Sequence, residues 1–175
     1  MKKIFFIILI SMFWGCATTM PDRMTKLDTF DPKKDQVIII QPFEFNPDIA
    51  TDVNKAYVTD FGKEIAIDIQ NCFYNHGYKN IKIDVAPKEG DYLIRGKITE
   101  ISGGNKHQRI WLGFGYGGTI ASVKGEIINL KKSNTLSVFN ITKQSNWTYS
   151  NNEAAVRENI YEVAVELVNK VLEKH

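Results

Sequence analysis

The sequence predicts an α+β domain in which a mostly antiparallel sheet of about five to six strands carries two helices on one face. Three observations predict this class. Several short segments alternate apolar and polar residues with the period of two that a half-buried strand requires. Two longer segments repeat apolar residues every three or four positions, as one face of an α-helix does. The elements follow one another in the order β-α-β-β-β-β-β-α, which is a segregated arrangement.

The chain from residue 36 onward begins with a strand and then a helix. The strand is predicted at 36–43, where a β-branched run ends at Pro42. The helix is predicted over 51–75, with Thr51 or Asp52 as its N-cap and His76-Gly77 as its end. Its apolar face consists of Val58, Phe61, Ile65, Ile69 and Cys72.

Five further strands and a closing helix follow. The strands are predicted at 79–85, 91–101, 108–114, 119–130 and 135–147. Alternation is clearest in 91–101, where Arg95, Lys97 and Thr99 share the polar face. The closing helix is predicted over 153–173 because its apolar residues keep the helical spacing: Val156, Ile160, Val163, Leu167 and Val171.

Two glycines interrupt the apolar faces of these strands. Gly96 lies between Ile94 and Ile98, and Gly125 lies between Val123 and Ile127. Glycine in the middle of a strand often marks the close approach of another backbone. We therefore expect a helix to lie over Gly96 and Gly125, and we expect larger side chains there to overpack the core.

The N-terminal residues have the pattern of a bacterial lipoprotein signal peptide. Lys2 and Lys3 precede an apolar run, and the small residue Gly15 precedes Cys16. The apolar stretch of about a dozen residues is shorter than the roughly 20 that a membrane-spanning helix needs. We expect residues 1–15 to be a cleaved signal peptide and Cys16 to carry acyl chains such as palmitate. The alternative is an ordinary cleaved signal peptide followed by a chance cysteine.

This assignment sets the domain organisation. Residues 16–35 contain two prolines and neither structural period, so we expect a lipidated N-terminus and a flexible tether. Residues 36–175 are expected to form a single periplasmic α+β domain. Without Lys2 and Lys3 the chain carries 20 basic and 20 acidic residues, and this balance argues against binding to nucleic acid. Membrane association is then expected to rest on the acyl chains.

The motifs that could carry chemistry do not have the context they require. Residues Gly113 to Gly118 match G-x-G-x-x-G, but a β-branched alternating segment follows where a dinucleotide site needs a helix. We therefore expect no nucleotide and interpret the glycines as a hairpin or bulge. The three histidines have no metal-ligand spacing, and Cys72 is expected to be a small buried side chain. We expect no cofactor, no metal and no catalytic set.

Part of the chain resembles a known family. The segments that carry the resemblance are the strand at 92–98, the Gly103-Gly104-Asn105 turn, the hairpin from Arg109 to Gly115, and the strand segments 121–123 and 126–128. This pattern resembles domain-of-unknown-function family 4410, a group of bacterial envelope lipoproteins, over roughly residues 36–130. The chain departs from it at 129–134, where the family pattern leads to an Asp and a Thr-Gly turn. The resemblance implies a class and a location, and it supplies no activity.

Together these observations predict a membrane-anchored bacterial lipoprotein whose periplasmic domain binds another envelope component, expected to be a protein, without catalysis. The alternatives are an enzyme acting on envelope glycan or lipid, and a carrier of a small apolar ligand. Because Ala17 follows Cys16 where an Asp commonly retains lipoproteins at the inner membrane, the resemblance to sorted lipoproteins implies the outer membrane, facing the periplasm. The partner-binding candidates are Arg109, Phe114 and Tyr116, since aromatic residues at a glycine-rich tip are typical anchors.

Overall fold

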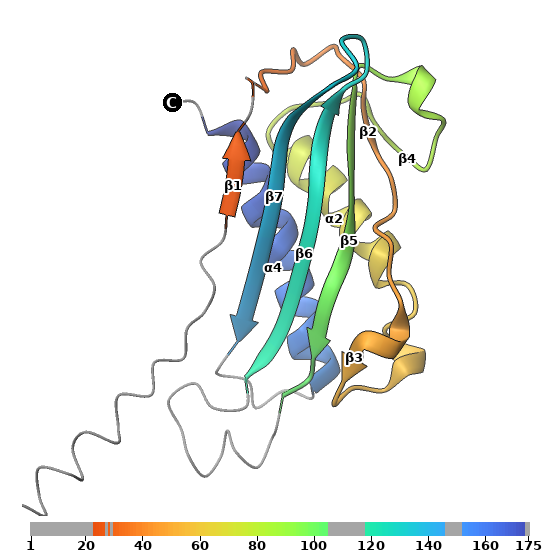
Figure 1. Ribbon diagram of the computed structural model, residues 1–175, viewed down its shortest axis with the longest axis vertical. Coiled ribbons are helices and arrows are strands. Elements are labelled where there is room, and N and C mark those ends of the chain that lie inside the picture. Colours follow the sequence, from red (N-terminus) through yellow and green to blue (C-terminus); the bar gives the residue numbers. More distant parts are fainter. Residues whose placement is uncertain (1–22, 27, 29, 105–117, 146–151, 174–175) are drawn as a thin grey trace, which may run out of the picture.

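The computed structural model describes residues 23–26, 28, 30–104, 118–145 and 152–173. In this part of the chain a seven-stranded mixed sheet carries two helices on one face, which is an α+β fold (Figure 1). The opposite face of the sheet, which no helix covers, is called the open face below. The predicted class and the placement of both helices on one face are therefore confirmed.

Three long antiparallel strands form the middle of the sheet: β5 (Tyr92–Ser102), β6 (Thr119–Asn129) and β7 (Asn134–Ser145). They lie within about two residues of the strands predicted from alternation. Each places one set of alternate residues in the core under the helices and the other set on the open face. The alternation was a sound predictor here because these strands have one buried face and one largely exposed face.

The strands at the two edges differ from the prediction. At one edge β2 (Ile38–Ile40) runs parallel to both β5 and β4 (Ile81–Ile83), so the sheet is mixed rather than mostly antiparallel. The connection from β2 to β4 contains a helix, and a connection of that length allows two strands to lie parallel. A short strand, β3 (Ala50–Thr51), pairs in parallel with the end of β5.

At the other edge, β1 (Arg23–Lys26) pairs antiparallel with β7. This strand lies inside the segment 16–35 that was expected to form a flexible tether. A strand of only four residues is too short for its period-two alternation to be recognised. It forms because the backbone of β7 pairs with it. The predicted strand at 108–114 lies outside the described residues.

The first helix is shorter than predicted. It is α2 (Phe61–Asn75), and it begins about ten residues after the predicted N-cap. Thr51 pairs with Ser102 in β3, Asp52 has a left-handed φ of +56°, and a 3₁₀ turn at Lys55–Tyr57 follows. The predicted end is confirmed, because His76 closes the helix and Gly77 adopts a φ of +83°.

The second helix, α4 (Asn152–Leu172), matches the predicted closing helix. It packs beside α2 and across β6 and β7 (Figure 1). Its buried polar residue Asn159 is 3% exposed and donates from Nδ2 to the carbonyl oxygen and the Oγ1 of Thr119, both at 2.9 Å. These bonds satisfy the carbonyl and hydroxyl oxygens of Thr119, the first residue of β6, inside the core. They also hold α4 at one position along the sheet. Neither described helix has the length and apolar content needed to cross a bilayer.

The two mid-strand glycines lie under aromatic rings. Gly96 and Gly125 are direct partners across β5 and β6. A Cβ at Gly96 would lie 2.6 Å from Cε1 of Phe43, and a Cβ at Gly125 would lie 2.4 Å from Cζ of Phe139. The expectation that a helix lies over them is therefore wrong: the rings of Phe43 and Phe139, 6.2 Å apart, fill that space. The close backbone approach at these glycines comes from the neighbouring strands.

Candidate functional site

The predicted site residues all lie outside the described part of the chain. These are the lipidation candidate Cys16 and the partner-binding candidates Arg109, Phe114 and Tyr116. The described residues contain a different candidate, a shallow groove on the open face of the sheet. It consists of two adjoining depressions that share Glu44 and Lys97.

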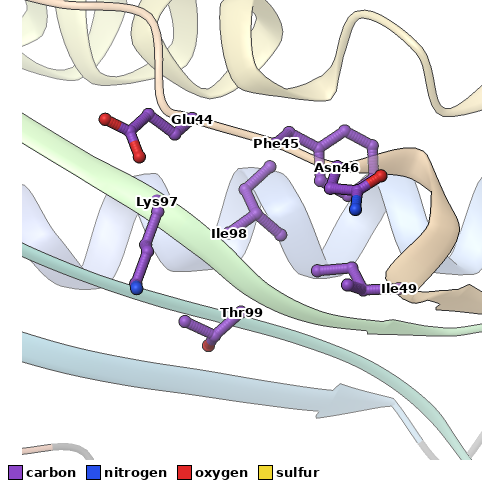
Figure 2. A pocket seen from close by; sticks show the side chains of 7 residues that line it. All are labelled: Glu44, Phe45, Asn46, Ile49, Lys97, Ile98 and Thr99. Carbon is purple, nitrogen blue, oxygen red and sulfur yellow. The ribbon is translucent and has the colours of Figure 1, made fainter.

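The first depression lies between β5 and the segment 44–49, and its volume is about 450 Å³ (Figure 2). The Glu44 N–H donates to the carbonyl oxygen of Gly96, and the Ile98 N–H donates to the carbonyl oxygen of Glu44, both at 2.9 Å. Beyond this point Asn46 caps a 3₁₀ turn (Pro47–Ile49) by accepting from the Asp48 N–H at 3.0 Å. The turn carries the chain away from β5, which opens the depression.

The second depression extends across β5, β6 and β7 and has a volume of about 580 Å³. It is lined by Gln41, Pro42, Glu44, Arg95, Gly96, Lys97, Lys124, Gly125, Glu126 and Val138. Three of these side chains are cationic and two are acidic. At the two central positions, Gly96 and Gly125, the backbone forms the floor, because these residues face the core and the charged side chains stand on their sequence neighbours.

Two lysines dominate the electrostatics of this groove. Lys97 and Lys124 are direct partners across β5 and β6, and both side chains are exposed. Neither forms an ion pair with another described residue. Figure 2 shows the Lys97 side chain running away from the Glu44 carboxylate. Like charges directly opposite each other on a sheet are destabilising. The carboxylate of Glu44, on the segment that pairs with β5 at Lys97, offsets one of the two lysine charges.

The neighbouring charges compensate the lysines only in part. Arg95 donates from Nε and Nη2 to Oε1 of Glu126, at 3.0 and 2.7 Å. This hydrogen bond is the largest cause of the lowered pKa of Glu126, and a further bond from Thr135 Oγ1 acts in the same direction. Glu126 is therefore ionised at neutral pH and neutralises Arg95. With the carboxylate of Glu44 counted, the groove keeps one net positive charge, which Lys97 and Lys124 carry.

The described residues offer no arrangement suited to nucleophilic or metal chemistry. The hydroxyls of Ser122 and Thr142 lie 3.0 Å apart on the open face, with Glu100 Oε2 at 3.4 Å from Ser122, and no described histidine joins them. Burial is the main cause that raises the pKa of the Cys72 thiol, so it stays protonated. Within the described ranges no three His, Cys, Asp or Glu side chains are placed to hold a metal ion.

Sequence reasoning did not find this groove. Alternation placed Lys97 on the polar face of its strand, which is confirmed. Lys124 and Glu44 come from separate strands, and their positions beside Lys97 depend on the register of the sheet. No motif spacing encodes that register, so no sequence signal could bring the three residues together.

The comparisons with known proteins agree with this fold. A family model described as "Domain of unknown function (DUF4410)" matches residues 38–148. A search of curated proteins finds no match. Among solved structures, the PelC dodecamer from Paraburkholderia phytofirmans is similar with a TM-score of 0.55 and 14% identity, over 83% of this chain and 96% of that one. A point variant of the same dodecamer is similar with a TM-score of 0.55 and 15% identity, over 84% and 97% of the two chains.

A third similar structure is a Xanthomonas campestris protein described by the family model DUF330. Its TM-score is 0.53 and its identity is 12%, over 85% of this chain and 91% of that chain. Identities this low establish a shared fold and carry no activity from one protein to the other.

Proposed function

This chain belongs to the DUF4410 family, and from that premise we propose that it is a bacterial lipoprotein, anchored in the membrane through Cys16, whose domain binds another envelope component without catalysis. The observation that carries the proposal is the N-terminal pattern, in which two lysines, an apolar run and a small residue precede a single cysteine. Ala17 supports placement in the outer membrane, with the domain facing the periplasm.

The pairing of β1 with β7 limits the distance between the domain and a membrane anchor at Cys16. If Cys16 lies at the bilayer, only residues 17–22 separate it from Arg23, the first residue of β1. Fully extended at about 3.3 Å per residue, the chain from Cys16 to Arg23 spans roughly 23 Å. We therefore propose a shorter connection than the roughly 60 Å that a tether extending to residue 35 would allow.

Binding is favoured over the two alternatives by the groove. A carrier of a small apolar ligand needs an enclosed apolar pocket, whereas both depressions are shallow and open to solvent, and half of the residues that line the larger one are charged. An enzyme acting on envelope glycan or lipid needs convergent titratable groups with shifted pKa values, and the groove holds a neutralised Arg95–Glu126 pair and two lysines. The similar fold of PelC is found in a dodecamer, which supports including a second copy of the chain among the possible partners.

Replacing Cys16 with serine tests the anchor. We expect the variant to leave the membrane fraction, because several acyl chains at about 0.8 kcal/mol per buried CH₂ hold the wild type there and one chain alone is marginal. Cell fractionation with an immunoblot measures the partition, and Cys72→Ser is the matched control because that thiol is buried in the core. Sedimentation of processed Cys16→Ser protein with membranes would contradict the lipid anchor.

The partner-binding candidates Arg109, Phe114 and Tyr116 remain a proposal, and the double change Phe114→Ser and Tyr116→Ser tests it. We expect loss of co-purifying envelope proteins with an unchanged melting temperature, since aromatic side chains at a glycine-rich tip act as anchors. Affinity purification from the native envelope and thermal melting measure the two effects. A large loss of stability would instead assign the two rings to the core.

A further inference from the structure

The outer surface of the helix layer carries a depression of about 330 Å³ between α2 and α4. It is lined by Glu64, Ile67, Asp68, Arg157 and Tyr161, and Tyr57 lies beside it against Arg157. We call these six residues the helix surface. The side chains of Tyr57, Ile67 and Tyr161 are 47%, 40% and 47% exposed, so three large apolar side chains meet solvent on this one surface.

Arg157 organises the helix surface. Its guanidinium lies 5.2 Å from the centre of the Tyr57 ring and donates to Glu64 at 3.1 Å. The pair neutralises Glu64, so Asp68 is the surplus negative charge of the depression. Burial, and then the nearby Glu64, raise the pKa of Asp68. Its charged form is thus disfavoured in the isolated domain and would be stabilised by an approaching cation.

The open-face groove has the complementary properties. Its three cationic side chains, Arg95, Lys97 and Lys124, exceed its two carboxylates, Glu44 and Glu126, by one positive charge, and Val138 is 41% exposed beside Glu126. We call Glu44, Arg95, Lys97, Lys124, Glu126 and Val138 the sheet surface. Of the five large apolar side chains exposed in the described residues, four lie on the helix surface or the sheet surface.

From this complementarity we propose that copies of this chain associate head-to-tail, with the helix surface of one copy docked on the sheet surface of the next. The proposal rests on the proposed binding function and names its partner as a second copy. Asp68 would approach Lys97 and Lys124, and the exposed aromatic side chains would cover Val138 and the backbone floor of the groove. The helix layer and the open face are opposite sides of the molecule (Figure 1), so each copy keeps one surface of each kind available and the association continues, as a ring if the rotation between copies closes and as a filament if it does not.

Two variants of the full-length protein, solubilised in detergent, test this arrangement. The sheet variant carries Lys97→Glu and Lys124→Glu, and the helix variant carries Asp68→Asn and Tyr161→Ser. Light scattering across a concentration series is expected to show assemblies larger than a dimer for the wild type and monomers for each variant alone. An equimolar mixture of the two variants is expected to form a dimer and stop there, since only one intact pair of surfaces remains.

The control variant makes the same change in charge outside both surfaces. The double variant Lys33→Glu and Lys132→Glu has the same net charge as the sheet variant, and both changes are at exposed sites. It is expected to assemble like the wild type. All variants must keep the wild-type melting temperature within a few degrees. A monomeric wild type at every concentration, self-association of the sheet variant alone, or no dimer in the mixture would each overturn the head-to-tail arrangement. None of these results depends on the membrane partition of Cys16→Ser, so failure of the assembly and failure of the anchor are distinguishable.

Discussion

Replacing Phe43 with alanine is expected to lower the free energy of unfolding by about 4 kcal/mol, the range found for truncating a buried phenylalanine. Phe43 is 3% exposed, and its ring lies over Gly96 and beside Phe139. Its backbone N–H donates to the carbonyl oxygen of Gly62 at 2.9 Å, so this residue joins the sheet to the first turn of α2. Because glycine supplies no side chain underneath, nothing can move in to fill the space that the ring leaves.

Denaturant unfolding followed by far-UV circular dichroism measures this effect, with wild type and variant under identical conditions. Phe43→Leu is the matched control, and we expect it to lose roughly 1 to 2 kcal/mol because leucine restores part of the volume. Equal losses for the two variants would mean that the aromatic ring does not cover the glycines.

Gly125→Val is expected to destabilise the domain by about 3 kcal/mol, at the upper end of the usual range for overpacking. A Cβ at this position would lie 2.3 Å from the carbonyl oxygen of Arg95 and 2.4 Å from Cζ of Phe139. The ring can turn aside, but the carbonyl oxygen belongs to β5, so relief requires the two strands to separate. The melting temperature is expected to fall by roughly 10 °C for a domain of this size.

Lys124→Val provides the control for Gly125→Val, because it places the same side chain at the adjacent position of β6 on the open face. That variant is expected to change stability by no more than about 0.5 kcal/mol. An unchanged melting temperature for Gly125→Val would show that the space above β6 is not filled by Phe139.

Much of the fold was predictable from local pattern. The alternation of Arg95, Lys97 and Thr99 with apolar residues located β5 and its two faces, and the helical spacing from Val156 to Val171 located α4. Both patterns arise because one side of the element is buried and the other meets water. This difference produces a periodic order of apolar and polar residues along the sequence. The family was also recognisable, since the segments that resemble it lie within the matched residues.

The candidate site was much less predictable. The sequence analysis favoured Arg109, Phe114 and Tyr116, which lie outside the described residues, whereas the described groove is built around Lys97 and Lys124. These lysines are far apart in sequence and meet only through the register of β5 and β6. The glycine at 125 was correctly identified as a site of close packing, but the ring that fills it comes from the next strand.

The sequence by itself therefore determined the α+β class, the three central strands, the closing helix and the family, because each depends on periodicity or short segments that neighbouring residues carry. Only the tertiary structure decided that β2 is parallel to β4 and β5, that Arg23–Lys26 joins the sheet, and that α2 begins at Phe61. It also decided that Lys97 faces Lys124 and that Phe43 and Phe139 cover the two glycines. These features depend on which distant segments pair, and that choice minimises the free energy of the whole core rather than of any one segment.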